Sequence, residues 1–146
     1  MRPWTALVET REIGAMTRAV LVVDDDVAFA NGLAALLQRH GYRTTVAYDG
    51  DQALAQLTAQ HCDVVISDIV MPGMIGYTLI QAAHALPGHD GLPFVFMSVL
   101  NEAKVRSFFD AGIRYLQKPF DSGALLAMLG EAIAGTSDYV GEVRPT

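Results

Sequence analysis

The chain has 146 residues, of which 51% are hydrophobic, and its formal net charge is −6. This length fits one domain with a full core, and the acidic balance argues against binding to nucleic acid. No apolar run approaches the roughly 18 residues that a membrane-spanning helix needs, and a single cysteine, Cys62, excludes an intrachain disulfide. These properties predict a protein of the cytoplasm.

Residues 1–17 carry charges scattered among apolar side chains and no continuous apolar segment. We therefore expect an N-terminal extension and not a secretion signal. Regular apolar patterns begin at residue 18 and end near residue 134. The sequence predicts one domain over 18–134, followed by a C-terminal tail over 135–146.

Five short segments are predicted to be strands, and three of them are continuous apolar runs, which are typical of strands buried on both faces of a parallel sheet. Arg43–Tyr48 instead alternates, so we expect it at a sheet edge. The predicted strands are Ala19–Val23, Arg43–Tyr48, the run around Val64–Ile66, Leu92–Met97 and Ile113–Gln117.

Five segments with helical periodicity alternate with these strands. They are Val27–His40, Asp51–Gln60, Gly76–Leu86, Asn101–Ala111 and Phe120–Ala134. This alternation, with short connections, predicts an α/β fold in which a parallel sheet has helices on both faces. A sheet of five strands favours the flavodoxin-like order 2-1-3-4-5, which places the first and third strands side by side.

Polar side chains stand where four of the predicted strands end. They are Asp24, Asp25 and Asp26 after the first strand, Asp68 after the third, Ser98 after the fourth and Lys118 after the fifth. Because parallel strands direct their carboxyl ends to the same edge of a sheet, we expect these side chains to lie close together.

Clustered carboxylates with no histidine or cysteine beside them favour a hard divalent cation, Mg²⁺ or Mn²⁺. A simpler role for the acid run is to cap the following helix, and Asp26 fits that role. Capping does not account for Asp68, because Pro72 and Gly73 follow it and no helix starts there. An aspartate, a divalent ion, a lysine and a hydroxyl are the groups that phosphoryl transfer to the aspartate requires.

Four motifs follow one another at the strand ends: Leu-Val-Val-Asp-Asp-Asp, Ser-Asp-Ile-Val-Met-Pro-Gly-Met, Met-Ser and Tyr-Leu-Gln-Lys-Pro-Phe. In this order and spacing they resemble the receiver domain of bacterial two-component response regulators, over about residues 18–134. The resemblance implies a stand-alone phosphoacceptor with self-catalysed transfer and slow autodephosphorylation, not an enzyme. Its expected partners are a sensor histidine kinase or a histidine phosphotransfer protein, and a downstream protein target or an onward phosphorelay, with neither nucleic acid nor membrane involved.

The resemblance also implies a role for each polar residue. Asp68 corresponds to the phosphoacceptor, and Lys118 to the lysine that contacts a phosphoryl oxygen. The bond between Lys118 and Pro119 is expected to be cis, as in family members. Asp25 and Asp68 would bind the metal directly, Asp24 through water, and the backbone carbonyl of Val70 would complete the protein's share of the site.

The resemblance makes Ser98 and Tyr115 the switch residues. Ser98 corresponds to the hydroxyl residue that turns inward to hydrogen-bond the phosphate, and Tyr115 to the aromatic residue that is buried or exposed according to phosphorylation. For Tyr115 a role in the core is the simpler alternative. Apolar residues cover more than one stripe of the last helix. We expect Met128 of this helix, together with Phe108 and Tyr115, to form a surface that binds a second copy of the chain or a target protein. A wide core face would explain the apolar pattern equally well.

The chain departs from the family pattern beside the site. Val99 follows Ser98 where the family prefers a small residue, and Val70 and Leu100 are also apolar. Branched side chains there would crowd the path of an attacking water. We therefore expect slow hydrolysis of the aspartyl phosphate and a weak response to small phosphodonors.

Two other functions are compatible with the sequence. The first is a binding module of receiver fold that works without phosphorylation. The second is a small phosphatase of haloacid-dehalogenase type, with Asp24 as nucleophile. In that case Ala28 occupies a position usually held by threonine or valine, and a cap domain is missing. The site of the acyl phosphate, Asp24 or Asp68, separates the phosphatase from the receiver.

Overall fold

A computed structural model of the chain describes residues 18–71, 74–107 and 113–135. Its main feature is a sheet of five strands in the order β2-β1-β3-β6-β7, with every neighbouring pair parallel. The strands are β1 (Ala19–Val23), β2 (Arg43–Ala47), β3 (Val64–Asp68), β6 (Phe94–Ser98) and β7 (Arg114–Gln117). Counted along the chain within this sheet, the order is 2-1-3-4-5, which confirms the predicted flavodoxin-like topology.

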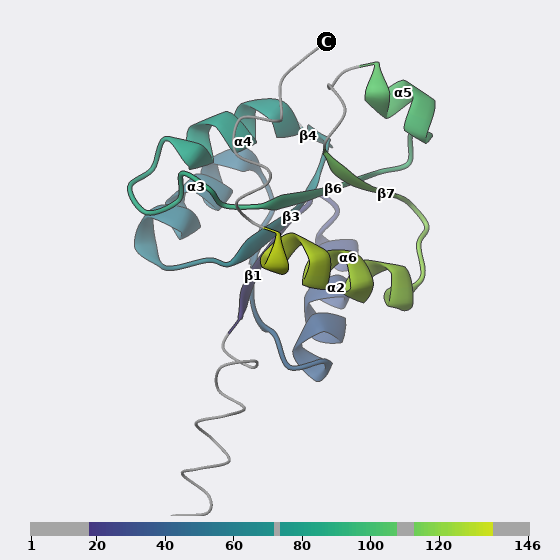
Figure 1. Ribbon diagram of the computed structural model, residues 1–146, viewed down its shortest axis with the longest axis horizontal. Helices are drawn as coiled ribbons and strands as arrows, with labels where there is room; N and C mark the ends of the chain where they lie inside the picture. Colours follow the sequence, from purple (N-terminus) through teal and green to yellow (C-terminus); the bar gives the residue numbers. More distant parts are fainter. Residues whose placement is uncertain (1–17, 72–73, 108–112, 136–146) are drawn as a thin grey trace, which may run out of the picture.

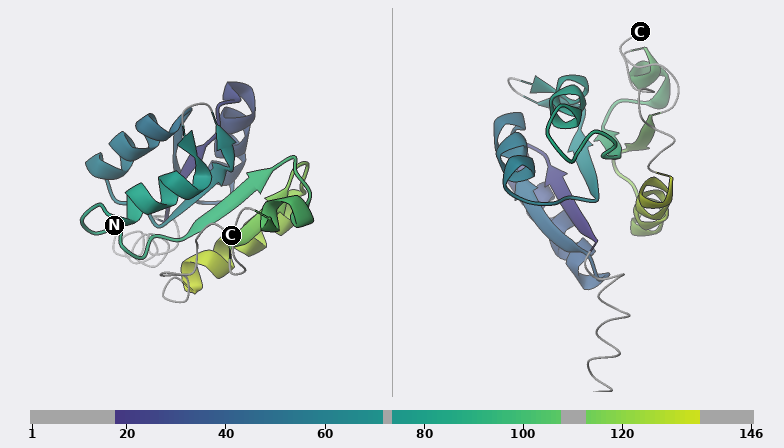
Figure 2. Two further views of the ribbon diagram at one scale, coloured as in Figure 1. Left: turned by 90° about the horizontal axis from the view of Figure 1, so that it is seen from above. Right: turned by 60° about the vertical axis from the view of Figure 1, so that its left-hand side comes forward.

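Helices cover both faces of the sheet (Figure 1), and Figure 2 shows this arrangement from two further directions. The described helices are α2 (Val27–Arg39), α3 (Gly50–Ala59), α4 (Gly76–His84), α5 (Glu102–Arg106) and α6 (Ser122–Ala134). The helices α2 and α6 lie on one face, and α3, α4 and α5 contribute to the apolar cluster of the other.

Two apolar clusters fill the space between the sheet and these helical layers. Residues of β1 belong to both clusters, which explains why its sequence is continuously apolar. Leu21 and Val23 belong to the cluster under α3 and α4, whereas Val20 and Val22 belong to the cluster under α2 and α6. Successive strand residues point to opposite faces. Since both faces are covered, all five residues of β1 are buried.

Some helix boundaries differ from the prediction because of local capping. The first helix was predicted to run from Val27 to His40, and its last residue was wrong: His40 is exposed and forms the C-cap. Gly41 follows with a φ of 93°, a conformation that ends helices. Gly50, predicted in a turn, is instead the first residue of α3, because Asp49 caps that helix.

The helix predicted over Asn101–Ala111 also has different boundaries in the described part of the chain. Asn101 is the N-cap, and the helix stops at Arg106. The hydroxyl of Ser107 donates a hydrogen bond to the Lys104 carbonyl, which is how serine competes with a continuing helix. Residues 108–111 of the prediction lie outside the described residues.

The connection after Asp68 contains an element that the sequence did not predict. Val70–Met71 forms β4 and Met74–Ile75 forms β5, and the two pair antiparallel. Strands of two residues have no measurable periodicity, so this ribbon was read as a loop.

No helix in the described part of the chain is long and apolar enough to cross a membrane.

Candidate functional site

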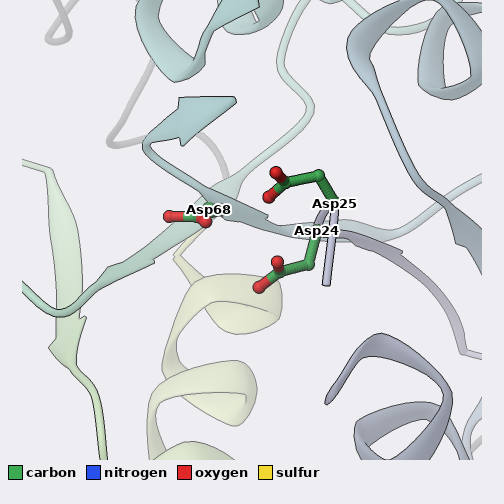
Figure 3. Close-up of side chains that lie close together, drawn as sticks. All are labelled: Asp24, Asp25 and Asp68. Carbon is green, nitrogen blue, oxygen red and sulfur yellow. The ribbon is translucent and has the colours of Figure 1, made fainter. Parts of the chain in front are cut away.

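Three carboxylates meet at one edge of the sheet. Asp24 and Asp25 follow β1, and Asp68 is the last residue of β3. The two strands are neighbours, with Val23 opposite Ser67, so their carboxyl ends coincide. Oxygen atoms of the three side chains lie within 4.8 Å of one another. Figure 3 shows Asp24 and Asp25 projecting beside Asp68, as the strand ends predicted.

Asp24 and Asp26 have different structural roles although they are two residues apart. Asp24 is only 1% exposed. One of its oxygens accepts a hydrogen bond from the backbone N–H of Asp26. Asp26 is exposed, and its own side chain accepts from the N–H of Phe29. This confirms Asp26 as the N-cap of α2 and leaves Asp24, Asp25 and Asp68 as the acid cluster.

Lys118 places a positive charge between two members of this cluster. Its ammonium nitrogen lies 2.7 Å from Oδ2 of Asp24 and 3.7 Å from Oδ2 of Asp68. The backbone N–H of Lys118 donates to the Ser98 carbonyl at 2.7 Å, which fixes the lysine at the end of the sheet. The bond to Pro119 is cis, as predicted.

An aromatic ring also lies against the Lys118 ammonium. The ammonium lies 4.4 Å from the centroid of the Phe29 ring. Phe120 contacts this ring edge to face, with centroids 6.3 Å apart. In the sequence, Phe29 lies in the predicted helix Val27–His40, and none of the motifs at the strand ends includes it. No local pattern distinguishes a ring that faces a cation from one that faces the core.

Burial raises the pKa of the Asp68 carboxyl to about 6. The ammonium of Lys118 and backbone N–H groups act in the opposite direction, and the charge of Asp24 adds to the rise. The carboxylate is therefore ionised at neutral pH but poorly solvated. An additional positive charge at the cluster would be favourable.

The acid cluster fits a hard divalent cation. Its donors are carboxylate oxygens, which Mg²⁺ and Mn²⁺ prefer. Asp24 is buried and Asp68 half-buried, whereas Asp25 is exposed, so an ion held here could keep several of its waters. Val70 begins β4 two residues after Asp68, and its carbonyl remains a predicted ligand.

Ser98 and Tyr115 are joined through the segment that leads from β6 to α5. Oγ of Ser98 accepts a hydrogen bond from the N–H of Leu100. The Tyr115 hydroxyl donates to the carbonyls of Ser98 and Leu100. Burial raises the pKa of that hydroxyl. Since Asn101 caps α5, Ser98 does not serve as the cap.

A family comparison completes this description of the site. The model of the response regulator receiver domain matches residues 20–130.

The chain belongs to this family.

Three relatives illustrate the likeness of this receiver domain to known proteins. The transcriptional regulatory protein ZraR of Salmonella typhimurium is 34% identical over 126 residues, which are 85% of this chain and 28% of ZraR. The chain thus spans little more than a quarter of that curated relative. The chemotaxis response regulator CheY4 of Vibrio cholerae is 31% identical with a TM-score of 0.70, covering 80% of this chain and 98% of that one.

The third relative is the receiver domain of the sensor histidine kinase PA1611 of Pseudomonas aeruginosa PAO1. It is 26% identical with a TM-score of 0.69, and the match covers 81% of this chain and 98% of that chain. That structure has a magnesium ion coordinated in its active-site cleft.

The predicted interface of the receiver domain is only partly described. Met128 is half-buried and packs against the cluster under α2 and α6, as do Leu126 and Ile133. Packing within the chain therefore accounts for part of the apolar excess on α6. Tyr115 is half-buried, and Phe108 lies outside the described residues. The homodimer or target surface remains a prediction.

Proposed function

We propose that this receiver domain accepts a phosphoryl group on Asp68 from a phosphohistidine of a sensor kinase or a phosphotransfer protein. In this step the P–N bond breaks, the donor imidazole leaves with the electron pair, and a P–O bond forms to the Asp68 carboxylate. The observation that carries the proposal is the position of the Lys118 ammonium, within 4 Å of both Asp24 and Asp68 beside a third carboxylate.

Each side chain has a distinct part in this proposal. Asp68 is the nucleophile, and its carboxylate is raised in energy by burial, as the pKa of about 6 indicates. Lys118 would hold an oxygen of the new phosphoryl group, and the Ser98 hydroxyl would donate to another. Asp24, Asp25, Asp68 and the Val70 carbonyl would hold Mg²⁺ or Mn²⁺. When bound, the ion supplies positive charge for the transferring group; the magnesium in the PA1611 receiver supports this assignment.

The geometry disfavours Asp24 as the nucleophile of a phosphatase. Asp24 is 1% exposed. One of its oxygens is bonded to the N–H of Asp26, and the other to the Lys118 ammonium at 2.7 Å. An oxygen that is already paired and shielded from solvent is a poor nucleophile. Asp68 is more accessible, with 15% of its side chain exposed.

Signalling would pass to a protein, either by contact with a downstream target or by onward transfer to another histidine. The acidic charge of −6 supports a protein partner over nucleic acid. The proposed location is the cytoplasm, where histidine kinases present their phosphohistidine.

Incubation with phosphorylated histidine kinases and Mg²⁺, followed by mass spectrometry of the peptides, tests the proposal. We expect the phosphoryl group on Asp68, and no labelling of Asp68→Asn. A label on Asp24 would support the phosphatase instead. Wild-type signalling by an Asp68→Asn variant would support the phosphorylation-independent binding module.

A further inference from the structure

The Lys118 ammonium rests on the Phe29 ring as well as on two carboxylates. We infer that Phe29 is a positioning residue for the phosphoryl transfer: its ring holds the Lys118 ammonium where it can pass from Asp24 to the group attached to Asp68. This inference rests on the proposed function, because the lysine would act on a phosphoryl group carried by Asp68. The distance that carries it is 4.4 Å from Nζ to the ring centroid.

The ring is held from two sides. The backbone N–H of Phe29 donates to the Asp26 side chain at 3.0 Å, so the cap of α2 anchors the residue. The side chain packs against the cluster under α2 and α6, where Phe120 contacts it edge to face. The acid run thus has two effects: Asp24 and Asp25 contribute to the cluster, and Asp26 anchors the backbone of the residue whose ring faces the Lys118 ammonium.

An aromatic face suits an ammonium that has to exchange partners. Lys118 is 15% exposed, so little water compensates its charge. The negative face of the ring attracts the ammonium without accepting a directed hydrogen bond. A carboxylate in that place would bind the lysine rigidly, and an aliphatic side chain would leave the charge unsupported on that side.

This arrangement explains how one lysine can serve two acids. The ammonium is 1 Å closer to Asp24 than to Asp68, at 2.7 against 3.7 Å. A short movement across the ring would bring it to an oxygen atom beyond the Asp68 carboxylate. Without the ring, attraction by the buried Asp24 would dominate, and the lysine would stay away from the reacting group.

The test compares Phe29→Leu, Phe29→Tyr and a matched control, Tyr42→Leu. The control removes an aromatic ring that packs against the same cluster, but neither the ring that faces the ammonium nor the Phe120 ring that packs on it. The first measurement is by NMR on the unphosphorylated, metal-free protein. The ring current of Phe29 should shift the protons of the carbon next to the Lys118 ammonium upfield. We expect this shift in the wild type, in Phe29→Tyr and in Tyr42→Leu, and its loss in Phe29→Leu.

The second measurement is the maximal rate of Asp68 phosphorylation by phosphoramidate, a small donor with a P–N bond, at saturating Mg²⁺; the weak response expected of small donors lowers the rates of the wild type and the variants alike. Phe29→Leu should lower the maximal rate about fivefold, the size expected from loss of one cation–π contact. Its dissociation constant for Mg²⁺, measured by titration, should stay within about twofold of the wild-type value, because the ring adds nothing to a carboxylate site. Phe29→Tyr should restore the rate.

Two results would overturn the inference. One is a wild-type protein without the upfield shift of the Lys118 protons. The other is a rate that falls equally in Phe29→Leu, Phe29→Tyr and Tyr42→Leu, which would show that Phe29 acts only through packing. If the wild type carries no phosphoryl group on Asp68 with any donor, the proposed function fails, while the NMR shift still decides where the ammonium rests.

Discussion

Asp24 and Asp68 present the same carboxylate at the ends of neighbouring strands, yet their surroundings differ. Asp24 has a short ion pair with Lys118 and a backbone donor. Asp68 has the longer contact with that lysine and loses hydration through burial, which raises its pKa to about 6. Residue type alone therefore does not distinguish the two acids; their hydration and their distance from one ammonium do.

The raised pKa makes Asp68 a source of instability at neutral pH. Its carboxyl titrates near 3.8 when unfolded and at about 6 when folded, so between these values the native state binds the extra proton. The associated stability is fully present below the unfolded pKa and is lost as the pH rises through 6. We expect metal-free Asp68→Asn to gain about 1–2 kcal/mol in free energy of unfolding at pH 7.5.

Urea unfolding at several pH values in the presence of EDTA checks this expectation. The gain should shrink as the pH falls from 7.5 to 4, because the wild-type carboxyl then becomes neutral in the folded protein. A gain that is independent of pH would show that ionisation of Asp68 is not its cause.

At the scale of elements, aspartates form the N-caps of three of the described helices. Asp26, Asp49 and Asp121 each accept a hydrogen bond from a backbone N–H in the first turn, of α2, α3 and α6 respectively. Such caps satisfy donors that a helix leaves unpaired and place a negative charge at its positive end. They also set the points where the chain leaves the sheet edge that carries the acid cluster.

Asp121 allows the contribution of one cap to be measured away from the acid cluster. Its Oδ1 accepts from the N–H of Ala124 at 2.7 Å. We expect Asp121→Ala to lower the free energy of unfolding by about 1 kcal/mol. Asp121→Asn, which keeps the acceptor, should retain most of the stability. Urea denaturation compares the two, and equal losses would contradict a capping role.

Two exposed valines close to the site residues in the sequence lead to a prediction about kinetics. Val99 is 73% exposed next to Ser98, and Val70, the first residue of β4, is 54% exposed two residues after Asp68. We expect them to hinder the attacking water, so that the aspartyl phosphate persists for minutes or longer. Val99→Ala should shorten its half-life.

Release of inorganic phosphate from the purified phosphoprotein measures this half-life. Val27→Ala provides the matched control, because Val27 is also exposed but belongs to α2 and adjoins neither Asp68 nor Ser98. A wild-type half-life of seconds, or equal effects of the two substitutions, would refute hindrance by Val99.

At the scale of the molecule, the sheet order brings together groups that are far apart in the chain. Lys118 and Asp24 are 94 residues apart and meet at 2.7 Å. The Lys118 ammonium lies within 4 Å of two of the three clustered carboxylates, so the folded protein without metal retains repulsion within the cluster. A bound divalent ion would remove that repulsion and stabilise the native state by mass action.

Asp25→Asn tests this balance. The variant should be more stable than the wild type without metal, because one of the repelling carboxylates is gone. Mg²⁺ at a hundredfold excess over its dissociation constant should stabilise the wild type by about 2.7 kcal/mol and the variant much less. Thermal unfolding with and without Mg²⁺ measures both effects, and melting temperatures that are unchanged in all cases would rule the prediction out.

The sequence by itself determined the order of strands and helices and the residues at the strand ends. Continuous apolar runs such as Ala19–Val23 report burial on both faces, and an acid after such a run marks a sheet edge. Both signals are local, and the structure confirms them. Even the capping role of Asp26 could be predicted, because the side chain and its partner are three residues apart.

Only the tertiary structure decided which contacts each of these residues makes. It placed the Lys118 ammonium closer to Asp24 than to Asp68, put the Phe29 ring beneath it, and exposed His40 beyond the end of α2. Sequence periodicity reports which face of an element is buried, but not which side chain it meets there. Such contacts depend on how elements about ninety residues apart pack, and that packing also sets the hydration on which the chemistry of Asp68 depends.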